Sequence, residues 1–201
     1  MTMAKGSSDI ILRDRLQFTL DANGDQTTVY GRFDLSDYVS TLERKGLSIK
    51  EINFMLRDPD HATGAWNSFG LSGSNASGSV IQTANMKVYA TTRAYEAAQT
   101  VGIASPDVLC VEEWQSHLGP NTGAAPAAQS VYALSTHNEY PVGTYHPDGF
   151  PVVTDLLVGI CAGNWDTAAD KTLELDVMII ASPITITAKQ LTEMLVQGQD
   201  Q

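Results

Sequence analysis

The chain has 201 residues, and its 12 Lys and Arg side chains against 23 Asp and Glu give a formal net charge of −11 at pH 7. This length fits a single domain, because all-β sandwiches and barrels often have about 200–250 residues in one unit. Since nucleic-acid affinity comes chiefly from Lys and Arg side chains that neutralise phosphates, we expect no direct contact with nucleic acid.

The N-terminal residues 1–8 lack the apolar stretch of a secretory signal, and no later run approaches the roughly 18–20 consecutive apolar residues of a membrane span. We therefore expect a soluble protein that is made in the cytoplasm. The expected organisation is a flexible N-terminus over 1–8, one β domain over 9–186, and a C-terminal amphipathic helix with a polar tail over 187–201.

The first part of the chain alternates apolar and polar residues, which is typical of half-buried strands. The segments 9–20 and 26–35 have this pattern, and the turn-forming residues 21–25 join them, so we predict a hairpin. The segment 36–47 is either a short helix or an irregular crossing. The pattern returns over 48–57, which predicts a strand that ends at the turn around Pro59.

Two long stretches of small and polar residues, 61–78 and 119–128, separate the later elements. Loops of this length often carry binding or inter-subunit contacts. Further strands are predicted over 79–91, 107–114, 129–136, 151–161 and 171–181, with a short helix over 93–99.

Eight or nine strands, spaced by turn signals and without βαβ alternation, predict an all-β fold. The expected architecture is an eight- to nine-stranded sandwich or barrel of the jelly-roll kind with a short C-terminal helix. Thr187 and Gln190 form a candidate capping box for that helix. The large apolar side chains of the first long loop and of one helix face are candidates for inter-subunit contacts: Trp66, Phe69, Leu71, Leu191, Met194 and Leu195.

The residues that could bind metals show no recognised pattern. Cys110 and Cys161 lie far apart in apolar segments, which favours two core thiols over a disulfide. The segment 21–25 has the oxygen-rich composition of a calcium loop, but Arg32 stands at the twelfth position, where such a loop needs a glutamate. A turn explains the same residues.

The four histidines lie in or beside predicted loops and lack the spacing that places two imidazoles on one metal. His137, Glu139 and Asp148 could form an acid–base set, although solvated loop residues are the favoured interpretation. The chain has no nucleophile elbow and no phosphate- or dinucleotide-binding loop. We therefore expect neither an enzyme nor a bound metal, cofactor or small-molecule substrate. The histidines are His61, His117, His137 and His146.

Trp66, Trp114 and Trp165 stand beside polar residues at predicted strand ends or in loops. They could cap the rim of the sandwich, contribute to a protein interface, or stack against sugars. The last option gives the alternative function, a carbohydrate-binding β-sandwich that uses exposed tryptophans.

Three stretches of the sequence carry a family resemblance: Gly31–Val39, Glu51–Pro59, and Leu175–Ala181 with the short helix that follows. Together they resemble the single-β-barrel major capsid proteins of icosahedral viruses with an internal membrane, of the sphaerolipovirus type. The resemblance covers about half of the chain and rests on pattern and organisation.

This resemblance implies an upright jelly roll that self-assembles into an icosahedral shell, with subunits of one or two related types in each capsomer. The implied partners are copies of the chain itself and a second, related capsid protein, close to an internal membrane. The implied location is the virion, after synthesis in the host cytoplasm. The family has no active site, so no functional residue is carried over.

Overall fold

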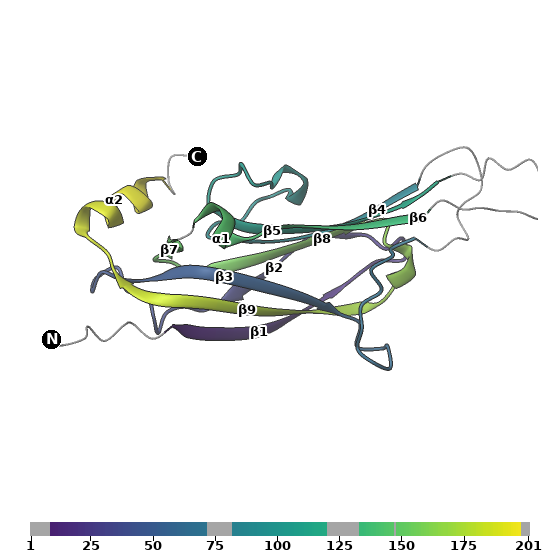
Figure 1. The fold of residues 1–201 in the computed structure, drawn as a ribbon, viewed down its shortest axis with the longest axis horizontal. Helices are drawn as coiled ribbons and strands as arrows, with labels where there is room; N and C mark the ends of the chain where they lie inside the picture. The colour runs from purple at the N-terminus through teal and green to yellow at the C-terminus, as the bar shows by residue number, and fades with distance from the viewer. Residues whose placement is uncertain (1–8, 72–81, 120–132, 147, 198–201) are drawn as a thin grey trace, which may run out of the picture.

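A computed structural model describes residues 9–71, 82–119, 133–146 and 148–197 (Figure 1). Nine strands form two antiparallel sheets, sheet A in the order β1–β9–β3–β7 and sheet B in the order β2–β8–β4–β5–β6. The strands are β1 (Ile10–Thr19), β2 (Gln26–Phe33), β3 (Lys45–Arg57), β4 (Gln82–Thr91), β5 (Val108–Leu118), β6 (Ala133–Tyr140), β7 (Phe150–Val152), β8 (Leu156–Gly163) and β9 (Thr172–Thr185).

The strand pairing is that of a jelly roll. The pairs β1·β9, β2·β8, β3·β7 and β4·β5 nest inside one another along the chain, as in one long hairpin whose tip joins β4 to β5. The hairpin is rolled up, so that β9 also pairs with β3, and β8 with β4. Strand β6 is added beside β5 as a fifth strand of sheet B. Both sheets keep open edges, so the predicted all-β fold is confirmed as a sandwich and not a closed barrel.

The predicted hairpin over 9–35 is wrong, although both of its strands exist. Strand β1 pairs with β9 in sheet A, whereas β2 pairs with β8 in sheet B, so the turn between them crosses from one sheet to the other. The carboxylate of Asp21 accepts hydrogen bonds from the backbone N–H groups of Asn23 and Asp25, at 2.8 and 2.9 Å. These residues therefore form a turn, as expected from the sequence.

Other segment boundaries differ from the predictions. Residues 36–44 form an irregular crossing, one of the two alternatives predicted for 36–47, and β3 begins at Lys45; the predicted strand over 151–161 is divided into β7 and β8. The predicted helix over 93–99 is replaced by an irregular segment with one 3-10 turn, η2 (Ala98–Thr100). Two short helices were not predicted: α1 (Val142–Tyr145) and the 3-10 turn η3 (Asp166–Ala168). The loop 119–128 lies almost entirely outside the described residues.

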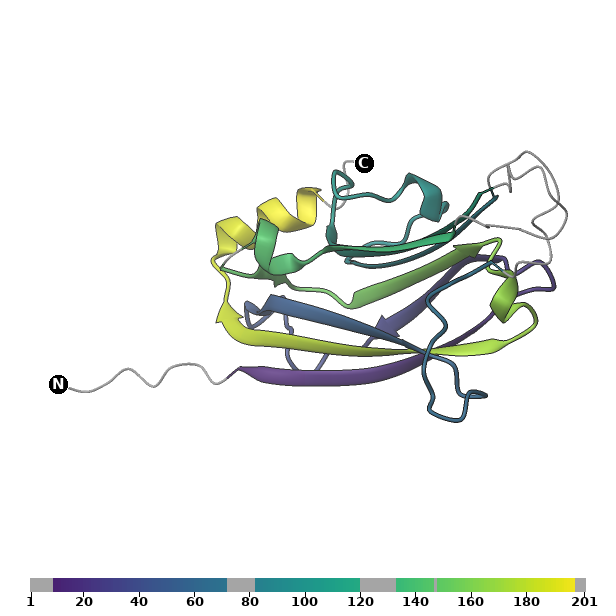
Figure 2. The ribbon, with the colours of Figure 1, turned by 45° about the vertical axis from the view of Figure 1, so that its right-hand side comes forward.

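The C-terminal helix α2 (Ala188–Gln197) begins with the predicted capping box. The hydroxyl of Thr187 accepts a hydrogen bond from the backbone N–H of Gln190 at 3.3 Å, and the Gln190 side-chain oxygen accepts one from the backbone N–H of Thr187 at 3.1 Å. Helix α2 lies beyond β9, at the end of the sandwich that carries α1 and β7 (Figures 1 and 2). Neither α1 nor α2, the α-helices of the described ranges, has the length and apolar character needed to cross a membrane.

One continuous cluster of buried apolar side chains fills the space between the sheets, and both contribute to it through alternate positions of their strands. Phe18 of β1, Ile179 of β9 and Val88 of β4 are examples. Both cysteines are free thiols, in agreement with the prediction, although only Cys110 is fully buried in this core.

The outer faces of the two sheets differ. The segment 92–107 lies over sheet B, whereas most of the outer face of sheet A is uncovered (Figures 1 and 2). Tyr89 of β4 is buried beneath that segment, and its hydroxyl lies 2.7 Å from the hydroxyl of Tyr30. The Tyr30 hydroxyl also accepts the backbone N–H of Tyr95 at 2.7 Å, which fastens the segment to the sheet.

Candidate functional site

The predicted contact residues of the first long loop pack onto their own domain. Leu71 is buried in the core, and Phe69 and Trp66 are half-buried against it. The Trp66 ring stacks on the Trp165 ring, with centroids 5.0 Å apart and an angle of 25° between the planes. The described part of this loop therefore closes one end of the sandwich.

The backbone of this loop is also fastened to the strands. The N–H of Gly70 donates to the hydroxyl of Ser116 at 3.0 Å, and its carbonyl accepts the N–H of Thr167 at 3.0 Å. The hydroxyl of Ser135 donates to the carbonyl of Ser68 at 2.8 Å. Residues 68–70 are thus held by β5, β6 and η3, and any contact with a neighbouring subunit would use the polar outer side of the loop.

Trp114 and Trp165 are buried, so they cannot act as exposed sugar-stacking platforms. Trp165 is fully enclosed because it fills the end of the sandwich beneath Trp66 and Gly70, where an added Cβ on the glycine would lie 2.5 Å from the Trp165 ring. Trp114 points into the core because β5 alternates its side chains between the two faces of sheet B.

Helix α2 carries the remaining predicted contact residues. Leu191 is half-buried, and the side chains of Met194 and Leu195 lie outside the described residues. The sequence therefore placed these residues in the correct element, and their role as contacts stays a prediction.

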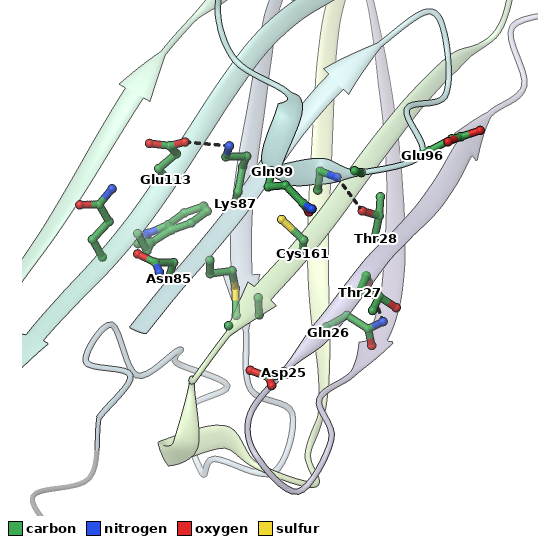
Figure 3. A pocket seen from close by; sticks show the side chains of 17 residues that line it. Asp25, Gln26, Thr27, Thr28, Asn85, Lys87, Glu96, Gln99, Glu113 and Cys161 are labelled. Atoms are coloured by element: carbon green, nitrogen blue, oxygen red, sulfur yellow. Dashed lines mark hydrogen bonds and ion pairs between the residues drawn. The ribbon is translucent and has the colours of Figure 1, made fainter. Parts of the chain in front are cut away.

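A cleft of about 710 Å³ lies on the outer face of sheet B, between the strands and the segment around η2 (Figure 3). Carboxylates line it at Asp25, Glu96 and Glu113, and a half-buried thiol lies within it at Cys161. Amide and hydroxyl groups make up most of the remaining polar lining: Gln26, Thr27, Thr28, Asn85, Gln99 and Gln115.

One of the three carboxylates of the cleft is paired with a lysine. The Lys87 ammonium lies 3.2 Å from a Glu113 carboxylate oxygen and donates to the carbonyl of Val101 at 2.8 Å (Figure 3). Burial raises the pKa of the Cys161 thiol, so this sulfur is a weak nucleophile at neutral pH. The cleft can offer hydrogen bonds to a polar ligand, and its described residues form no nucleophile–base pair.

Of the three residues of the predicted acid–base set, the structure brings His137 and Glu139 together. Glu112, and not Asp148, is the second carboxylate beside His137. His137 Nδ1 lies 3.4 Å from a Glu139 oxygen, whereas His137 Nε2 lies 3.1 Å from a Glu112 oxygen. Asp148 is elsewhere, beside Ser48, whose hydroxyl donates to its carbonyl. His117 and His137 lie within β5 and β6, so the prediction that all four histidines are in or beside loops is wrong for these two.

Sequence reasoning missed Glu112, because the register that places it opposite Glu139 depends on the pairing of β5 with β6. It also missed the cleft, which exists only because 92–107 folds over sheet B.

No model of a known protein family matches this chain, and no curated protein sequence matches it. The functional argument therefore rests on the fold and on the described side chains.

Proposed function

We propose that this chain is the major capsid subunit of an icosahedral virus and assembles with copies of itself into the shell. The observation that carries the proposal is the jelly-roll strand order of a single sandwich. Jelly rolls occur in viral capsids, and also in lectins and cupins, so the fold must be weighed together with the rest of the molecule.

The interior of the sandwich favours a structural role. Cupins and other ligand-binding β-barrels use the space inside the fold for a ligand or metal, whereas the space between these two sheets is filled by a continuous apolar cluster.

The outer face of sheet A offers a surface for assembly. It is broad, largely uncovered, and carries exposed apolar side chains at Ile11 and Met55. A row of ion pairs crosses the same face, with Arg15 2.5 Å from Asp176 and Arg57 3.3 Å from Glu174. In a repeated subunit contact, apolar side chains contribute binding energy, and the ordered charges beside them fix the orientation of the subunits.

The sequence supports the same proposal in two ways. The resemblance to sphaerolipovirus-type capsid proteins implies partners of one or two related types and a membrane beneath the shell. The shortage of basic residues suits a shell that does not contact the genome.

Light scattering and electron microscopy of the purified chain test this proposal. We expect oligomers or shells whose formation depends on concentration. The variant Met55→Glu places a charge on the sheet A face and should weaken assembly, whereas Ile103→Glu changes an equally exposed residue in the segment over sheet B and should not. A chain that stays monomeric at millimolar concentration and is absent from particles of its source would refute the proposal.

A carbohydrate-binding module is the second candidate, and the cleft of Figure 3 is the observation that favours it. Neutral amide and hydroxyl groups suit hydrogen bonding to sugar hydroxyls. Glycan-array binding that is lost in Asn85→Ala and kept in Met55→Glu would support this function. Absence of binding across a broad array would count against it.

A further inference from the structure

Glu112, His137 and Glu139 meet at the edge of sheet B, where β5 pairs with β6. The register places Glu112 opposite Glu139 and Trp114 opposite His137, so all four side chains lie on one face of the sheet. Trp114 belongs to the core cluster, which identifies this as the inner face. The side chains of Glu112, His137 and Glu139 therefore lie at the open side of the sandwich, beside the core.

The electrostatics of this cluster are unfavourable without a cation. Like charges directly opposite each other on paired strands destabilise a sheet, and Glu112 and Glu139 are such a pair. Among the described residues, the ion pairs of these two carboxylates involve only His137, which is charged only when protonated.

The surroundings hold two of the three groups in place. The His137 ring stacks on the Trp114 ring, with centroids 4.5 Å apart and an angle of 9° between the planes. The Glu112 side chain is only 13% exposed, and the backbone N–H of Phe54 in β3 donates to its carboxylate.

We propose that Glu112, His137 and Glu139 bind a divalent transition-metal ion of the zinc type. One donor atom from each residue lies within 4.8 Å of the others. Donors around a tetrahedral ion at about 2.0–2.2 Å lie roughly 3.3–3.6 Å apart. The two carboxylates contact different ring nitrogens, Glu112 at Nε2 and Glu139 at Nδ1, so Glu139 must turn toward Nε2 to share an ion there, and its side chain is 61% exposed.

The donor set selects the metal. An imidazole with two carboxylates suits zinc and its first-row neighbours, whereas calcium and magnesium prefer sites built from oxygen alone. Three protein ligands leave a fourth position for water. Because Glu112 also contacts β3, the ion would hold the edge of sheet B to the edge of sheet A.

Titration calorimetry of the metal-free full-length chain with ZnCl₂ tests this site. We expect one Zn²⁺ per chain, no comparable binding of Ca²⁺ or Mg²⁺, and quenching of tryptophan fluorescence by Co²⁺ because Trp114 stacks on the ligand imidazole. The measurement needs no assembly, so its outcome is independent of the proposed capsid function.

Three variants locate the ion. Glu139→Gln changes an exposed side chain, should keep the fold, and should weaken Zn²⁺ binding at least ~10-fold. His137→Gln should abolish binding. The matched control, His117→Gln, changes a histidine of β5 on the opposite face of sheet B and should bind Zn²⁺ as the parent does. Absence of Zn²⁺ binding in the parent, or equal binding in Glu139→Gln, His137→Gln and the parent, would overturn the proposal.

Discussion

Replacing Trp165 with alanine should destabilise the domain more than most single substitutions, because this ring closes the end of the sandwich. The ring is fully buried, stacks on Trp66 and covers Gly70. An aromatic side chain buries about 150–250 Å², which at ~25 cal/mol/Å² gives an upper bound of about 4–6 kcal/mol. Measured substitutions of this kind cost about 3–5 kcal/mol, and we expect this range.

Such a loss is a large share of the about 5–15 kcal/mol that stabilises a typical domain. It corresponds to a fall in Tm of roughly 6–20 °C for a chain of this size. Trp66→Ala should cost less, because that ring is only half-buried. The double variant should reveal a coupling of about 0.5–1.5 kcal/mol between the two stacked rings.

Urea unfolding followed by far-UV circular dichroism measures these free energies, with thermal unfolding as a second readout. An equal slope of the unfolding free energy against urea concentration in all variants would show that their unfolded states are comparable. A loss below about 1 kcal/mol for Trp165→Ala would refute the reasoning. It would mean that the described part of the first long loop is not held by this ring.

Three further predictions concern other parts of the fold. Gly159→Ala should cost about 1–3 kcal/mol, seen as a lower Tm, because its Cβ would lie 2.3 Å from the Tyr89 ring; an unchanged Tm would contradict this packing. The hydrogen bond from Arg15 lowers the pKa of Asp176, so this carboxylate stabilises the fold above about pH 4 and loses its effect as the pH falls through its lowered pKa. The urea midpoint of Asp176→Asn should lie below that of the parent at pH 7 and approach it at pH 3, whereas a constant gap would argue against this pair. Thr187→Ala should weaken the start of α2 by about 0.5–2 kcal/mol, seen as faster amide exchange in 188–191 with little change in Tm; unchanged exchange would show that the cap is dispensable.

The strands were predictable from the sequence because their signal is local. Alternation around Phe18 predicts β1, and the pattern around Ile179 predicts β9, since each strand has one face toward the core. Their pairing was not predictable, because no local pattern links Arg15 to a partner 161 residues away. The same limit explains the wrong hairpin, in which two strands adjacent in sequence were assigned to one sheet.

In the candidate sites too, features that depend on neighbouring residues were predictable, and features that depend on distant parts of the chain were not. The capping box at Thr187 was predictable, because both of its residues lie within one turn of helix. The burial of Trp165 was not, because it depends on Gly70 and Trp66 folding over the ring from a distant loop. The assembly of Glu112 with His137 likewise requires the register between β5 and β6.

The position of β9 has a consequence for how the chain folds during synthesis. Within sheet A, β1 pairs only with β9, and most of β3 has no other partner in this sheet. Because β1 is made before β9, sheet A cannot form until synthesis has passed Thr185. If copies of the chain associate through the outer face of sheet A, as proposed above, they cannot do so before β9 has been made.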